Sequence, residues 1–262
     1  MSHSVLGVLC VRLASSRYPV KALALVNGMP ALEYQLRGLD HTGLPYCVSV
    51  SDLRDDAPVI EIANRLGVPW FCAGIASETA QTFEAVRWWG AGIKHIIRLK
   101  TDELFYDARI MRATVRRHLS TGVAVTKASC TLDAAAAEVY DVAYLEALVK
   151  EYGKRVDEER GNLFLSGYVV DELGKDEIGE GCWLTNRNEF PMEFDTADDL
   201  MKIRTVLGAL GPYPDTAAVI QFLRDHPEVN GMNLPVNRVV IDATGAHTEI
   251  IRPNAGVRSG EE

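Results

Sequence analysis

Short, near-continuous apolar runs recur along the first half of the chain, and their length is typical of buried strands. They occupy residues 5–11, 46–50, 68–71, 94–99 and 123–127. The segments between them place apolar residues at helical spacing, as in Leu32, Leu36 and Leu39 after Pro30. The same spacing predicts helices at residues 55–66, after Ser77 and at residues 108–119.

Strands that alternate with helices at this interval predict crossover connections. Such connections join parallel strands, so we expect an α/β fold with a mostly parallel central sheet and helices on both faces. In sheets of this kind, ligands bind beyond the carboxyl ends of the strands, where helix N-termini also point. The polar loop at residues 12–21 directly follows the first predicted strand and therefore lies at that edge.

The second half of the chain has a less regular pattern. Residues 131–141 predict a strand or hairpin before a helix at 143–152, and residues 190–194 return to strand character. Thr196 and Asp199 resemble a capping box, which predicts the start of another helix.

Residues 215–225 form the last predicted helix. The preceding elements predict one domain over residues 1–231, with a polar, glycine-rich arm inserted at about 153–190. Residues 232–262 are predicted to form a C-terminal extension.

The composition is that of an ordinary globular protein, with 47% hydrophobic and 24% charged residues among 262. The net charge of −9 disfavours binding to nucleic acid or to anionic membranes, because phosphates would be repelled. No apolar segment reaches the length of a membrane span and no signal peptide is evident, so we expect a cytoplasmic location. Five widely spaced cysteines indicate reduced, buried thiols, and the six histidines lack zinc-ligand spacing.

The loop after the first predicted strand forms a basic island in this acidic chain. Arg12, Arg17 and Lys21, with the hydroxyls of Ser15 and Ser16, could bind several phosphate oxygens. The glycine-rich fingerprints GxxxxGK[ST] and GxGxxG are both absent, so side-chain cations are the remaining route to phosphate. The alternative is a solvated loop whose arginines pair with surface acids.

Several segments, in order along the chain, resemble the motifs of one enzyme family. The loop RLASSRYPVK at 12–21, followed by NGMPALE at 27–33, resembles R-x-G-S-[ST]-R-L-P-G-K with G-x-P-L-[IL]-E. Further matches are SVSD at 49–52 with acids at 55–56, GVP at 67–69 with Gly74, RLKTD at 98–102, FDTADDL at 194–200 and HPEV at 226–229. Over about residues 5–230 the chain is thus similar to cytidylyltransferases of the spore-coat polysaccharide biosynthesis type, relatives of CMP-sialic acid and CMP-Kdo synthetases.

The resemblance implies a Rossmann-like nucleotidyltransferase fold and transfer of a nucleoside monophosphate from CTP to a small sugar, phosphosugar or phosphonate acceptor. It implies Arg12, Arg17 and Lys21 as catalytic contacts to the triphosphate. It implies nucleotide contacts from Leu13, Ala14, Ser15, Ser16, Ser51, Asp52 and Arg98. For Ser51 and Asp52, a turn with an aspartate cap is the alternative.

Asp102 and Asp195 each follow a predicted strand and are candidate ligands of Mg²⁺. A hard divalent ion binds one or two carboxylates together with phosphate oxygens and water. The alternatives are an ordinary loop acid for Asp102 and a helix-entry acid for Asp195. The resemblance also suggests a homodimer with the predicted arm as a contact surface, and a monomer is the alternative.

The chain departs from the family pattern at several positions. Ala14 and Val20 stand where the loop has glycines, Glu103 follows Asp102, and Thr82 replaces a common arginine. These departures leave a second function open, namely a non-catalytic relative that binds a nucleotide or sugar nucleotide, or supports a partner enzyme. A nucleotide-sugar glycosyltransferase is a weaker third, because the chain has no D-x-D motif.

The acceptor is not identified by any motif in the second half. Arg160, Tyr168 and Arg187 are candidate acceptor contacts there.

Overall fold

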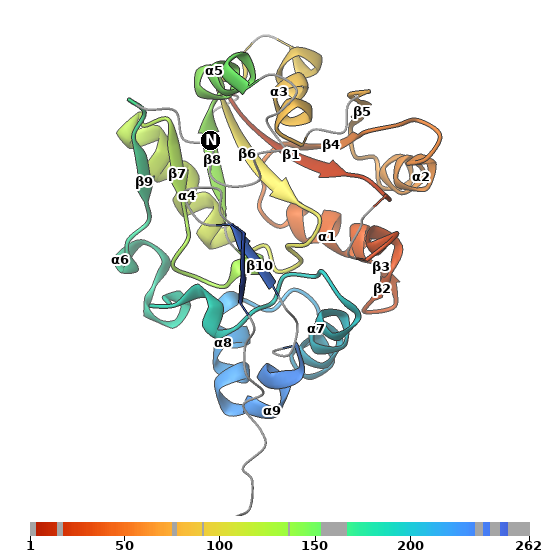
Figure 1. Cartoon of the computed structure of the whole chain (residues 1–262), viewed down its shortest axis with the longest axis vertical. Helices are drawn as coiled ribbons and strands as arrows, with labels where there is room; N and C mark the ends of the chain where they lie inside the picture. Colours follow the sequence, from red (N-terminus) through yellow and green to blue (C-terminus); the bar gives the residue numbers. More distant parts are fainter. Residues whose placement is uncertain are drawn as a thin grey trace, which may run out of the picture.

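A seven-stranded, mostly parallel sheet lies at the centre of the molecule (Figure 1). The computed structural model describes residues 4–14, 18–74, 78–90, 92–135, 137–152, 167–233, 238–241 and 247–250. The strand order is β5-β4-β1-β6-β8-β7-β9, and β8 alone runs antiparallel to its neighbours in this sheet. The strands are β1 (Val5–Val11), β4 (Tyr46–Val50), β5 (Trp70–Cys72), β6 (His95–Lys100), β7 (Val125–Lys127), β8 (Glu138–Asp141) and β9 (Val170–Glu172).

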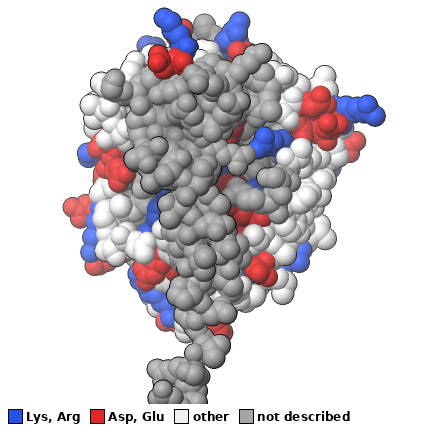
Figure 2. Space-filling model, in the orientation of Figure 1, with Lys and Arg blue, Asp and Glu red and all other residues white. Residues whose placement is uncertain are grey.

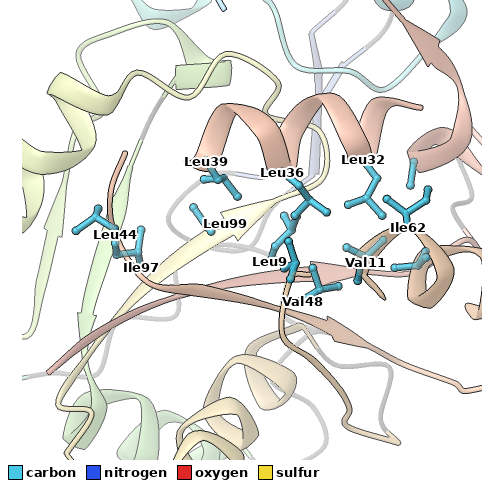
Figure 3. Close-up of a cluster of buried hydrophobic side chains, with 14 of the residues drawn as sticks. Leu9, Val11, Leu32, Leu36, Leu39, Leu44, Val48, Ile62, Ile97 and Leu99 are labelled. Carbon is cyan, nitrogen blue, oxygen red and sulfur yellow. The ribbon is translucent and has the colours of Figure 1, made fainter. Parts of the chain in front are cut away.

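Helices cover both faces of this sheet because the side chains of each strand alternate between the two sides. From β1, Leu9 and Val11 pack with α1 (Ala31–Asp40), α2 (Ala57–Leu66) and α4 (Ala108–Thr121) in the cluster of Figure 3. Leu6 and Val8 point the other way and pack with α3 (Glu78–Trp89) and α5 (Val142–Tyr152). The predicted α/β class and its two-sided helical cover are therefore confirmed.

The C-terminal helices pack against the loops that leave the sheet. They are α7 (Ala197–Leu210), α8 (Thr216–Asp225) and α9 (Pro227–Asn230), at the bottom of Figure 1. Their apolar side chains form a second cluster with Leu104 and Phe105, which follow β6, and with Phe194. This cluster fixes the segment before α7 against the carboxyl end of β6.

The remaining elements are short. They are the hairpin β2 (Leu25–Val26) and β3 (Met29–Pro30), α6 (Lys175–Ile178), the pair β10 (Arg238–Ile241) and β11 (His247–Ile250), and 3₁₀ turns at Lys21–Leu23, Asp133–Ala135, Glu180–Cys182, Arg187–Glu189 and Gly231–Asn233. β9, α6 and two of these turns lie in the described part of the predicted arm, residues 167–190, whereas residues 153–166 lie outside the described residues.

Two predicted elements are wrong. Residues 190–194 form no strand, because the one hydrogen bond between their backbone and that of another segment in the described residues runs from Phe194 N to Asp102 O. The apolar residues of 190–194 are buried in the second cluster instead, which explains their strand-like pattern. The helix at 215–225 is also not the last, since Pro227 begins α9.

Three features of the structure bear on the composition: its helices, its surface charges and its cysteines. None of the described helices is both long enough and apolar enough to cross a membrane. On the described part of the face in Figure 2, basic and acidic side chains are interspersed. All cysteines are free thiols, but only Cys47 and Cys182 are fully buried, so the prediction of buried thiols holds for two of the five.

Candidate functional site

The loop after β1 is held by its own backbone and ends in a buried lysine. Val20 N donates to Leu13 O at 3.0 Å, and Val20 adopts a left-handed conformation with φ 52°. A left-handed residue reverses the chain sharply, and the 3₁₀ turn Lys21–Leu23 begins directly after it. Lys21 is only 7% exposed, so the loop delivers its side chain inward rather than toward solvent.

Lys21 lies between the two aspartates that were predicted to bind a metal. Its Nζ is 3.3 Å from Asp195 Oδ1 and 3.6 Å from Asp102 Oδ2. The same nitrogen donates to Phe194 O at 3.2 Å. Residues far apart in sequence thus meet at the carboxyl end of β6, with one cation between two anions.

Backbone and side-chain hydrogen bonds position Asp195 relative to Asp102. The two acidic segments are joined by the bond from Phe194 N to Asp102 O, at 2.9 Å. Asp199, 1% exposed in the first turn of α7, accepts from the backbone N of Asp195 and of Thr196 and from the Thr196 hydroxyl. The predicted capping box at Thr196 is therefore confirmed, and the same bonds fix the backbone of Asp195.

A buried lysine anchors this segment from the other side. Lys202 is 0% exposed and donates to Pro191 O, Asn230 O, Asn230 Oδ1 and Asn233 Oδ1 at 2.8–3.1 Å. Asn233 Nδ2 in turn donates to Asp199 Oδ1. The network connects the segment that carries Asp195 to the turns that follow α8. The sequence pattern did not predict that this lysine is buried, because a lysine in a helix is typical of an exposed position.

Asp56 ties the loops after β1 and β4 together. It is 1% exposed, and its Oδ1 accepts from Leu13 N while its Oδ2 accepts from Ser51 N, Ser51 Oγ and Asp52 N, all within 3.2 Å. Asp56 was seen in the sequence only as a match to a family acid and as a helix start. In the structure, its hydrogen bonds hold two candidate nucleotide-binding loops side by side.

Asp52 itself forms the turn that was the alternative to a ligand contact. Its exposed carboxylate accepts from Arg54 N and Asp55 N, and these two backbone hydrogen bonds lower its pKa. Leu13 packs in the core cluster, with its N on Asp56 and its O on Val20 N. Nucleotide contacts from these residues remain predictions.

Arg98 points to the face covered by α3 and α5. Its guanidinium lies between Glu78 and Glu138, at 3.2 and 3.3 Å, and the charge of Glu78 raises its pKa. Burial raises the pKa of Glu138, but the nearby cations, Arg98 first, outweigh it and bring the pKa to about 2. The predicted nucleotide contact is thus held by acids of the protein itself.

Three further charged side chains, Lys100, Glu103 and Glu193, interact electrostatically with Asp102. Lys100 Nζ lies 2.9 Å from Glu103 Oε1 and 3.9 Å from Glu193 Oε1. Burial is the main cause that raises the pKa of Glu103 to about 8 and that of Glu193 to about 7, with nearby carboxylates adding to both. Glu103, the extra acid that the sequence placed beside the candidate metal, is buried and pairs with Lys100.

The structure brings Lys21, Asp102 and Asp195 together, and Asp56 brings Leu13 beside Ser51 and Asp52. The other predicted residues that the structure describes do not join these groups. Arg12 and Ala14 are exposed, Arg187 is exposed, and Tyr168 contacts Tyr144 edge-on. Ser15, Ser16, Arg17, Ser77 and Arg160 lie outside the described residues.

The three atoms that pair with the Lys21 ammonium are oxygens of Phe194, Asp102 and Asp195. Oxygen ligands suit a hard cation such as Mg²⁺. Among the described residues, no group of three or more His, Cys, Asp or Glu side chains could hold a metal ion. Two carboxylates from the protein are the number that Mg²⁺ commonly uses when phosphate oxygens and water complete its coordination. The residues present therefore fit a metal ion that is also ligated by phosphate oxygens and water, but they do not fit a metal ion held by protein side chains alone.

Comparison with solved structures identifies the architecture. A cytidylyltransferase from Leptospira borgpetersenii serovar Hardjo-bovis aligns with TM-score 0.74 and 18% identity, covering 86% of this chain and 96% of that one. A CMP:2-keto-3-deoxy-manno-octonic acid synthetase complexed with CTP aligns with TM-score 0.59 and 16% identity, covering 78% and 98%. A Mycobacterium tuberculosis protein complexed with manganese aligns with TM-score 0.51 and 16% identity, covering 77% and 98%.

Two comparisons that use the sequence find no match. No protein-family model matches the chain, and no curated protein matches it. The structural likeness nevertheless extends over most of the chain and nearly all of each neighbour. This protein therefore has the Rossmann-like fold of solved nucleotidyltransferases, with a seven-stranded sheet that is parallel except at β8.

Proposed function

We propose that this protein is a Mg²⁺-dependent nucleotidyltransferase that uses CTP. It would transfer CMP to a sugar, phosphosugar or phosphonate acceptor and release pyrophosphate. The single observation that supports this most is the convergence of Lys21, Asp102 and Asp195 within 3.6 Å at the carboxyl end of β6. The fold supports it as well, since one neighbour is a cytidylyltransferase and another was solved with CTP.

Asp102 and Asp195 would hold the metal. When bound, Mg²⁺ would neutralise charge on the phosphate oxygens and polarise the phosphorus that is attacked. The neighbour complexed with manganese makes a divalent ion a reasonable ligand for this fold.

The chain's own cations would bind the triphosphate. Lys21 and Arg12 carry fixed charge on the loop after β1, and Arg17 lies in the same loop. Within the described residues Arg12 is exposed and makes no ion pair, so its guanidinium is available for bidentate contact with phosphate. The loops that Asp56 aligns would hold the ribose and base.

The chemistry is an in-line displacement at the α-phosphorus. An acceptor oxygen forms the new P–O bond while the bond to the oxygen bridging the α- and β-phosphorus breaks, and pyrophosphate leaves with that oxygen. Catalysis by positioning and charge neutralisation requires no protein base when the acceptor oxygen is already an anion, and a sugar hydroxyl would release its proton to water as the P–O bond forms.

Pyrophosphate release tests this function. The assay combines each of the four nucleoside triphosphates with Mg²⁺ and a panel of sugar, phosphosugar and phosphonate acceptors. We expect release with CTP and one acceptor class, and loss of at least a hundredfold in Asp102→Asn. Glu172→Gln removes an exposed acid at the end of β9 and serves as the matched control. Nucleotide binding without release from any acceptor would instead favour a non-catalytic binding protein.

The remaining proposals are the homodimer and the contact surface on residues 153–190. The exposed aromatic ring of Tyr168 and the exposed Val169 lie in the described part of that segment and support an interaction surface there. Sedimentation equilibrium of the protein and of Val169→Asp would test the dimer, since a charge at an interface should dissociate it.

A further inference from the structure

The ammonium group of Lys21 is surrounded by the kind of atoms that coordinate a divalent metal. A carbonyl oxygen of Phe194 and carboxylate oxygens of Asp195 and Asp102 lie at 3.2, 3.3 and 3.6 Å from Nζ. The three side chains are at most 16% exposed. The lysine therefore neutralises the same carboxylates that the proposed function assigns to Mg²⁺.

We propose that Lys21 is an internal counter-ion that competes with the divalent metal for Asp102 and Asp195. Metal binding then becomes conditional on the nucleotide. This inference rests on the proposed function and specifies how its site is regulated. Two cations facing the same pair of carboxylates repel each other, so the metal binds weakly while the ammonium is in place.

A triphosphate resolves the competition. It offers Lys21 another set of anionic oxygens, and once the ammonium pairs with them, both aspartates can bind the metal. The ligand that satisfies all charges at once is the metal–triphosphate complex rather than either component alone. Lysine suits this exchange because its charge is a compact point at the end of a flexible four-carbon stem.

The exchange requires only side-chain motion. The backbone at Lys21 is fixed by the hydrogen bond from Val20 N to Leu13 O and by the 3₁₀ turn that follows. The acids are fixed by the bond from Phe194 N to Asp102 O and by Asp199. A rigid frame around one movable charge is the arrangement that a competition of this kind needs.

Titration of nucleotide-free protein with Mn²⁺, followed by the electron paramagnetic resonance signal of free Mn²⁺, tests the proposal without any measurement of activity. We expect Lys21→Met to bind Mn²⁺ at least tenfold more tightly than the wild type. The control Lys175→Met removes the same charge from an exposed position in α6, where the lysine pairs with Glu180. Its affinity should stay within threefold of the wild type. Adding Asp102→Asn to Lys21→Met should abolish the gain.

Unchanged or weaker Mn²⁺ affinity in Lys21→Met would overturn the proposal, as would an equal gain in Lys175→Met. If Lys21→Met does not fold, Lys21→Gln offers a hydrogen-bonding side chain, with the same expected gain and the same contradicting result. Wild-type protein that binds Mn²⁺ tightly without nucleotide also contradicts it. The Mn²⁺ titration contains no nucleotide and no acceptor, so its outcome does not depend on pyrophosphate release. Absence of pyrophosphate release would reject the proposed function, whereas the Mn²⁺ affinities alone decide whether Lys21 competes with the metal.

Discussion

Val20 holds a left-handed backbone conformation that a β-branched residue seldom adopts. Its φ of 52° is the conformation that glycine provides without steric cost, and glycine is the residue in the family pattern that this loop resembles. Valine at this position therefore stores strain in the loop. The hydrogen bond from Val20 N to Leu13 O and the buried position of Lys21 show what the shape of the loop secures.

Glycine should therefore be better than alanine at position 20. We expect Val20→Gly to be more stable than Val20→Ala by about 1 kcal/mol, since alanine keeps the left-handed penalty and glycine removes it. The free energy of unfolding in urea measures the difference. At the exposed Met201 in α7 the order should reverse, with alanine more stable than glycine by about 1 kcal/mol. If alanine is more stable than glycine at position 20 as well, Val20 is not strained.

His118 is a buried histidine that the protein keeps neutral. It is 1% exposed on α4, and burial, followed by the neighbouring His95, lowers its pKa to about 4. Its ring nitrogens lie 3.1 Å from His95 Nδ1 and 3.1 Å from Thr126 Oγ1. Both contacts are available to an imidazole that carries one proton.

Acid should therefore destabilise the fold through His118. The unfolded chain protonates a histidine near pH 6.5, whereas the folded protein does so only near pH 4. The unfolded state binds more protons in between, so stability falls as pH decreases through that window, by an amount on the order of 3 kcal/mol. Melting temperatures from pH 7 to 4.5 should fall less steeply for His118→Gln than for the wild type. The exposed His41→Gln is the control, and equal slopes for all three proteins would contradict the assignment.

At the scale of elements, Asp56 connects strands that are neighbours in the sheet but distant in sequence. The loops after β1 and β4 are held at one carboxylate through Leu13, Ser51 and Asp52. A polar loop would otherwise bind water and move independently of its neighbour. The buried acid makes the two loops one unit.

Removing that carboxylate should cost stability and loosen both loops. We expect Asp56→Ala to lower the free energy of unfolding by about 1–3 kcal/mol, because buried backbone donors lose their acceptor. Amide hydrogen exchange at Leu13 and Ser51 should accelerate together. Asp55→Ala, at the exposed neighbouring acid, should change stability by less than about 0.5 kcal/mol. Faster exchange at only one of the two loops would show that they are not coupled through Asp56.

The elements of the first half could be predicted because their burial pattern is simple. Strands buried on both faces give continuous apolar runs, and β1 and β4 match the predicted ranges at both ends. The segment at 190–194 misled for a related reason, since its apolar residues are buried by helices rather than by a sheet. A run of apolar residues predicts that a segment is buried, but it does not predict whether a sheet or a helix covers the segment.

At the scale of the whole molecule, the site depends on contacts that no local pattern contains. Lys21 and Asp195 come from opposite ends of the domain, and the second hydrophobic cluster brings them together by packing α7 and α8 against the loop after β6. The order of the motifs and their resemblance to a family singled out Lys21, Asp102 and Asp195 in the sequence. The sequence did not predict that the ammonium would stand between the two acids, or that Asp56 and Lys202 would hold the frame.

A crystal structure with Mg²⁺ and a CTP analogue whose α,β-bridging oxygen is replaced by methylene tests the central claim most directly. We predict a metal ion ligated by Asp102 and Asp195, with Lys21 Nζ moved from the aspartates onto phosphate oxygens. The base should lie beside the loops that Asp56 joins. A triphosphate bound elsewhere, with Lys21 still paired to both aspartates, would contradict the account and leave only the fold.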